Sequence, residues 1–124
     1  MPAPDSGFVS IVDDDELMRG ALQGLLREAG FPARAFASAD EFLRSGALDE
    51  SSCLIVDVRM PGLSGLELQT RLREERIAIP IIFITAHGDA RMRAQALRAG
   101  AADFLSKPFD DEVLLRSVRA ALGL

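Results

Sequence analysis

Short apolar runs alternate with longer segments of helical periodicity along the whole chain. The five apolar runs are residues 8–12, 33–37, 53–56, 81–84 and 102–105. These runs are too short for helices, and those at 53–56 and 81–84 are apolar at every position, as strands covered on both faces are. Strands that alternate with helices form a parallel sheet, because parallel strands need a crossover connection. The sequence therefore predicts an α/β fold with helices on both faces of the sheet.

Five segments of helical character follow these runs, and residues suited to helix starts mark most of them. Two pairs are expected to form capping boxes and two aspartates to act as N-caps: Ser38 with Glu41, Ser64 with Glu67, Asp89, and Asp110. In the first helix, Leu17, Ala21, Leu25 and Leu26 recur at helical spacing. No repeat or linker interrupts the pattern, so we expect one domain over residues 1–124 with its core at 8–122.

The charge balance and the apolar pattern exclude several classes of protein. Fourteen Lys and Arg residues against nineteen Asp and Glu residues give a net charge of −5, which argues against binding of a nucleic-acid backbone. The chain has no run of about 18 apolar residues for a membrane span, and its first residues do not resemble a signal peptide. The single cysteine, Cys53, permits no internal disulfide. We expect a cytoplasmic domain that by itself binds neither nucleic acid nor membrane.

Polar residues with matched chemistry follow four of the apolar runs, where each expected strand ends. They are Asp13 and Asp14, Asp57, Thr85, and Lys107, which is the only lysine in the chain. A single residue of this kind is most often a turn or capping residue. The carboxyl ends of parallel strands, however, meet at the same edge of a sheet, where binding sites of such folds lie. We therefore expect these side chains to form one site.

Three carboxylates in one pocket repel one another unless a divalent cation binds between them, and Mg²⁺, or Mn²⁺ in its place, suits oxygen ligands. With the metal bound, a carboxylate can attack phosphorus and form an aspartyl phosphate, whose oxygens a lysine and a hydroxyl can stabilise. Asp57 is the best candidate nucleophile, because it ends the most apolar run and precedes a loop expected to leave it exposed. Asp13 and Asp14 are better placed as metal ligands, and we expect the three acids to be uncompensated when no metal is bound.

These residues stand in sequence blocks that resemble the receiver domain of bacterial two-component response regulators. The blocks are Asp13-Asp14, Asp57-Val58-Arg59-Met60-Pro61-Gly62, Thr85-Ala86 and Lys107-Pro108-Phe109, within a resemblance that runs from Phe8 to Leu122. The resemblance implies a flavodoxin-like, doubly wound sheet of five parallel strands in the order 2-1-3-4-5, with five helices. Together with Phe104, the run Thr85-Ala86-His87-Gly88 is similar to the nitrogen-fixation regulator subfamily.

The resemblance also implies a chemical role for each matched residue. Asp57 would accept the phosphoryl group from a sensor histidine kinase. Asp13, Asp14 and Asp57 would bind Mg²⁺ together with the main-chain carbonyl of Arg59, and Lys107 would bind the phosphoryl group. The peptide bond between Lys107 and Pro108 is expected to be cis, as it commonly is in this family.

Further positions would carry the response. The amide of Ala86 would contact the phosphoryl group, while Arg59 and His87 would adjust how long that group lasts. Thr85 and Phe104 would act as the switch, the threonine hydroxyl moving inward and vacating space for the ring. The surface of the helix after Asp89, the strand 102–105 and the last helix would then form a homodimer. An output domain for transcription regulation would follow the receiver, unless the chain is a complete single-domain regulator.

One class of enzyme shares part of this chemistry. Small Mg²⁺-dependent phosphohydrolases of the haloacid dehalogenase type also use an aspartate nucleophile, a hydroxyl, a lysine and metal-binding acids. They carry a second acid two residues after the nucleophile, where this chain has Arg59, and the chain has no cap segment to enclose a substrate. The complete set of acceptor, metal, hydroxyl and lysine residues also disfavours a pure binding module. We expect a signalling domain that catalyses only its own phosphorylation and dephosphorylation.

Overall fold

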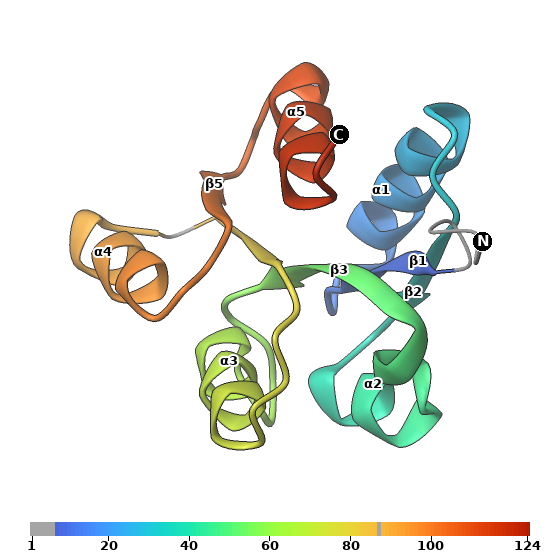
Figure 1. Cartoon of the computed structure of the whole chain (residues 1–124). Coiled ribbons are helices and arrows are strands. Elements are labelled where there is room, and N and C mark those ends of the chain that lie inside the picture. The colour runs from blue at the N-terminus through green and yellow to red at the C-terminus, as the bar shows by residue number, and fades with distance from the viewer. Residues whose placement is uncertain (1–6, 87) are drawn as a thin grey trace.

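The computed structural model describes residues 7–86 and 88–124, which form a layered α/β fold around one five-stranded sheet (Figure 1). All strand pairs are parallel, and the strand order is β2-β1-β3-β4-β5, which confirms the expected topology. The strands are β1 (Phe8–Val12), β2 (Ala33–Phe36), β3 (Ser51–Asp57), β4 (Ile81–Thr85) and β5 (Asp103–Ser106). β3 is therefore the central strand, and its last residue is the predicted nucleophile, Asp57.

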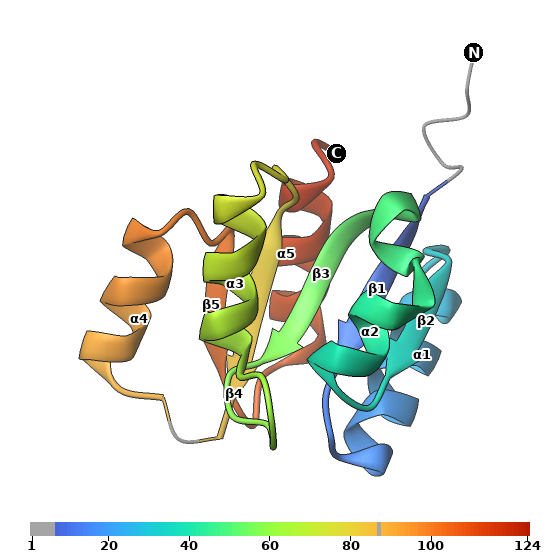
Figure 2. The same ribbon diagram turned by 90° about the horizontal axis from the view of Figure 1, so that it is seen from below.

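Five α-helices connect or follow the strands, as expected. They are α1 (Glu16–Glu28), α2 (Ala39–Ser45), α3 (Gly65–Glu74), α4 (Ala90–Arg98) and α5 (Asp111–Ala121). Helices α1 and α5 cover one face of the sheet, while α2 and α3 cover the other and α4 lies beside β5 (Figures 1 and 2). Among the residues that the structure describes, no helix combines the length and apolar character that crossing a bilayer requires.

The first turn of α1 leaves an apolar side chain exposed. Asp15 caps the helix by accepting hydrogen bonds from the amides of Leu17 and Met18, so the helix begins at Glu16. Its buried residues are Leu22 and Leu26, and Leu17 is 84% exposed. Leu17 precedes Leu22 by five residues, or about 140° around the helix axis. Leu17 therefore belongs to the helix, as its spacing predicts, but lies outside its buried face.

The helix starts follow the capping residues predicted from the sequence, with small differences. Ser64 and Glu67 form the complete capping box, with each side chain bonding to the amide of the other residue. At α2 only half of the expected box forms, because the Glu41 carboxylate accepts from the amide of Ala37 instead of that of Ser38. A short 3₁₀ helix, η2 (Ala47–Glu50), precedes β3 and was not predicted.

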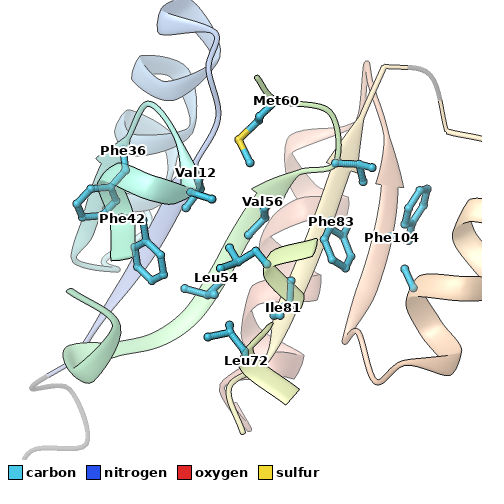
Figure 3. Close-up of a cluster of buried hydrophobic side chains, with 14 of the residues drawn as sticks. Val12, Phe36, Phe42, Leu54, Val56, Met60, Leu72, Ile81, Phe83 and Phe104 are labelled. Carbon is cyan, nitrogen blue, oxygen red and sulfur yellow. The ribbon is translucent and has the colours of Figure 1, made fainter. Parts of the chain in front are cut away.

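The two faces of the sheet carry separate hydrophobic clusters, which explains why the central runs are apolar at every position. In β3, Leu54 and Val56 point into the cluster under α2 and α3, shown in Figure 3, while Cys53 and Ile55 point into the cluster under α1 and α5. All four side chains are fully buried. Because β3 is fixed from both sides, the position of Asp57 at its end is fixed as well.

Gly65 is the point where α3 comes closest to the end of β3. A Cβ atom at this position would lie 2.5 Å from the carbonyl oxygen of Asp57 and 3.0 Å from Cα of Val58. In contrast, a Cβ at Gly24 on α1 would meet no atom within 4 Å. Only a residue without a side chain lets α3 begin so close to the nucleophile.

We expect Gly65→Ala to lower the free energy of unfolding by about 1–3 kcal/mol, because the packed backbone has to shift. The matched variant Gly24→Ala should raise it by about 0.5–1 kcal/mol, since alanine favours the helix and restricts the unfolded chain. Urea denaturation of both variants measures these changes. A Gly65→Ala protein as stable as wild type would show that the contact between α3 and β3 is loose.

Candidate functional site

The predicted carboxylates come together at the carboxyl edge of the sheet. Asp13 directly follows β1, Asp57 ends β3, and Asp14 stands beside Asp13 in the β1–α1 turn. One carboxylate oxygen from each of the three lies within 4.8 Å of the other two. Asp13 is fully buried and Asp14 is exposed, so the cluster opens to solvent on the side of Asp14. Three hard oxygen donors at this spacing fit the ligand preference of Mg²⁺.

Lys107 reaches into this cluster from the end of β5. Its Nζ donates hydrogen bonds to Oδ2 of Asp13 at 3.0 Å and to Oδ2 of Asp57 at 3.2 Å. Its amide donates to the carbonyl of Thr85 at 2.8 Å, and the Lys107–Pro108 peptide bond is cis, as expected. The expectation that the acids are uncompensated was wrong, because the ammonium group neutralises part of their charge.

Asp57 is more enclosed than the sequence suggested. Its side chain is 10% exposed, because β1 and β4 flank the end of the central strand, so the prediction of an exposed carboxylate was wrong. Its Oδ1 accepts a hydrogen bond from the amide of Arg59 at 3.1 Å, while its Oδ2 faces Lys107. Both oxygens are therefore held in place, with Arg59 itself exposed at the surface.

Burial and charge shift the pKa values of Asp57 and Lys107 in the same direction. Burial raises the pKa of the Asp57 carboxyl above its ordinary value, and Asp13 adds to the rise, although the Arg59 amide and Lys107 oppose it. For Lys107, burial lowers the pKa, but hydrogen bonds and charges from Asp13 and Asp57 outweigh that effect and leave it raised. The ammonium group is thus firmly protonated, and ionised Asp57 carries a desolvation cost.

Thr85 and Phe104, the predicted switch residues, both pack around Gly88. Both are buried, Phe104 to 3% exposure, and the Phe104 ring centroid is 6.3 Å from that of Phe83. A Cβ at Gly88 would come within 2.6 Å of the Thr85 methyl and 2.8 Å of the Phe104 ring, so both side chains pack on this glycine. The ring is buried in this structure, and the predicted movement of the two side chains on phosphorylation stays a prediction.

Ala86 and His87 are the two remaining predicted site residues. Ala86 follows β4 at the same edge and is exposed. His87 lies outside the residues that the structure describes, so its predicted role in phosphoryl lifetime stays a prediction.

Side chains from α4 and α5 form hydrogen bonds with two neighbouring residues of β5, one of which is the predicted switch residue Phe104. The carbonyl of Phe104 accepts from Nη1 of Arg93 on α4 at 3.1 Å, and its amide donates to Oδ1 of Asp103 at 2.8 Å. Oδ2 of Asp103 accepts from the hydroxyl of Ser117 on α5 at 2.5 Å. These contacts join α4, β5 and α5, and sequence patterns alone did not indicate them.

Comparison with known proteins gives consistent matches. Residues 9–119 match the family described as the response regulator receiver domain. Over 119 residues the chain is 52% identical to nodulation protein W of Bradyrhizobium diazoefficiens, covering 96% of the chain and 52% of that protein. It is 42% identical over 120 residues to the transcriptional regulatory protein FixJ of Azorhizobium caulinodans, covering 97% of the chain and 57% of that protein.

A solved structure supports the same relationship. The crystal structure of FixJ-N superposes with a TM-score of 0.84 at 41% identity, covering 94% of each chain. The chain spans about half the length of the curated relatives it matches.

Replacing the buried carboxylate tests the electrostatic description of this site. A raised pKa means that the folded state binds a proton more tightly than the unfolded state, so Asp57 lowers stability as the pH rises above the ordinary pKa of the carboxyl, and the full cost is present above the raised pKa. At neutral pH and with a chelator present, we expect Asp57→Asn to raise the melting temperature by about 3–5 °C, the shift that roughly 1 kcal/mol produces. Calorimetry measures it.

The exposed neighbour Asp14 supplies the matched control, and Asp14→Asn should change the melting temperature less. Excess Mg²⁺ should narrow the difference in melting temperature between Asp57→Asn and wild type, because wild type binds the ion better and is stabilised more. Melting of Asp57→Asn below wild type in chelator would show that Lys107 more than offsets the cost of burying the charge.

Proposed function

This chain belongs to the family of response regulator receiver domains, and we propose that its Asp57 accepts a phosphoryl group from a sensor histidine kinase. The observation that carries the proposal is the cluster of Asp13, Asp14 and Asp57 around the Lys107 ammonium group. In the transfer, an oxygen of Asp57 forms a bond to phosphorus while the bond from phosphorus to the donor imidazole nitrogen breaks, and that nitrogen keeps the electron pair.

Each residue of the cluster supports a part of this chemistry. Asp13, Asp14 and Asp57, with the main-chain carbonyl of Arg59, are the proposed ligands for Mg²⁺ or Mn²⁺. When bound, the ion supplies positive charge to the phosphoryl oxygens. Lys107, which contacts Asp57, would neutralise a second phosphoryl oxygen.

The loops around the cluster complete the proposal. The Thr85 hydroxyl and the Ala86 amide would bind the remaining phosphoryl oxygen, while Arg59 and His87 would set how long the group lasts. A phosphohydrolase is not favoured, because the exposed Arg59 stands where such an enzyme needs a general acid.

For output, we propose that the phosphoryl group acts through Thr85 and Phe104 on the surface of α4, β5 and α5. The contacts that join these elements through Asp103, Phe104 and Arg93 support this route. We propose that the surface forms a homodimer and that the domain works in the cytoplasm as part of a transcription regulator. The name of one relative, transcriptional regulatory protein FixJ, supports the proposed role in transcription regulation.

The phosphoryl acceptor can be identified by intact mass. After exposure to acetyl phosphate and Mg²⁺, we expect wild type to gain the mass of one phosphoryl group and Asp57→Asn to gain none. Base should remove the group, because it is an acyl phosphate. A stable phosphate on a serine or threonine, or repeated turnover of a phosphoester, would contradict the proposal.

The output route can be tested by sedimentation with beryllofluoride as a mimic of the phosphoryl group. We expect the mimic to shift wild type toward dimer and Thr85→Ala to remain monomeric, although Thr85→Ala should still accept phosphate at Asp57. Thr70→Ala on the exposed surface of α3 removes a hydroxyl away from the site and should dimerise like wild type. Equal dimerisation of Thr85→Ala and wild type would remove the hydroxyl from the route.

A further inference from the structure

Arg19 is the fourth residue of α1 and reaches back to the turn that carries Asp13 and Asp14. Its Nη1 donates a hydrogen bond of 2.8 Å to the main-chain carbonyl of Asp13. That carbonyl belongs to the peptide unit that joins the two proposed metal ligands. The guanidinium group therefore acts on the backbone between them and touches neither carboxylate in the contacts of the described residues.

The other polar groups of Asp13 are occupied as well. Its amide donates to the carbonyl of Phe36 at 3.1 Å, its Oδ1 accepts from the amide of Asp15 at 2.8 Å, and its Oδ2 accepts from Lys107. Every hydrogen-bonding atom of Asp13 therefore has a partner. Asp14 is exposed, and its amide nitrogen belongs to the same peptide unit that Arg19 holds through the Asp13 carbonyl.

We propose that Arg19 is a positioning residue of the metal site. Its bond to the Asp13 carbonyl fixes the peptide plane from which both the Asp13 and Asp14 side chains extend, so that their oxygens face the same point. This inference rests on the proposed function, in that Mg²⁺ is taken as the ion. Groups that orient metal ligands from outside the coordination sphere typically contribute about 10–100-fold to metal affinity.

The sign of the effect separates positioning from simple electrostatics. Arg19 carries a positive charge beside a cation site, so its removal would strengthen Mg²⁺ binding if charge alone mattered. If Arg19 orients the ligands, its removal weakens binding in spite of the lost repulsion. The two roles therefore predict opposite changes in affinity.

Arg27 offers a matched control on the same helix. Its Nη2 donates to the carbonyl of Ala33 at 3.1 Å, which is the same kind of contact at the far end of α1. Each variant, Arg19→Ala and Arg27→Ala, removes one arginine and one bond to a main-chain carbonyl. Only Arg19 is next to the acidic turn.

The experiment is a calorimetric Mg²⁺ titration of wild type, Arg19→Ala and Arg27→Ala. We expect Arg19→Ala to bind Mg²⁺ about tenfold more weakly than wild type, and Arg27→Ala to bind as wild type does. Arg19→Lys keeps the charge without the planar guanidinium group, and its Mg²⁺ affinity should lie between those of wild type and Arg19→Ala. Binding by Arg19→Ala that equals or exceeds wild type would overturn the proposal.

A second measurement needs no metal. Hydrogen exchange in the presence of a chelator should be faster at the Asp15 amide, which bonds to Asp13, in Arg19→Ala than in Arg27→Ala. Equal exchange in the two variants would overturn the positioning role, while failure of wild type to bind Mg²⁺ would overturn only the proposed metal site. If Arg19→Ala does not fold, Arg19→Lys is compared with Arg27→Lys by the same measurements.

Discussion

The contact of one ammonium group with two buried carboxylates connects the parts of this structure that matter most. Lys107 comes from the end of β5, Asp13 from the end of β1 and Asp57 from the end of β3, so a single side chain spans the carboxyl edge of the sheet. Removing these charges from water is costly, and such pairs seldom add net stability. The arrangement is better explained by a site that needs negative charge held ready and partly neutralised.

Apolar packing is dense around the central strand that carries the site and sparse around α4, which belongs to the proposed output surface. The central strand β3 is enclosed by hydrophobic clusters on both faces. Helix α4 differs, because Ala96 is the one fully buried residue among its described side chains, and polar contacts from Gln69 and Arg93 hold it. Elements with little apolar packing are the ones that shift at low cost.

Both edges of the sheet carry main-chain groups that are satisfied by side chains. At β2, Gln23 and Arg27 donate to the carbonyl of Ala33, and at β5, Arg93 and Asp103 bond to the main chain of Phe104. Edge groups occupied in this way are poor partners for another strand. We therefore expect the proposed dimer to use the side chains of α4 and α5 and not a continued sheet.

The sequence by itself determined the strands and the polar residues at their ends, because apolar runs and capping residues act within a few neighbours along the chain. It also placed Asp13, Asp57, Thr85 and Lys107 at one edge, since parallel strands share a direction. The order of the strands came from family resemblance, because periodicity does not identify which strands pair. Only the tertiary structure decided the burial of Asp57, the bonds of Lys107 and the reach of Arg19. Each of these depends on where side chains from distant segments meet, and that is set by packing.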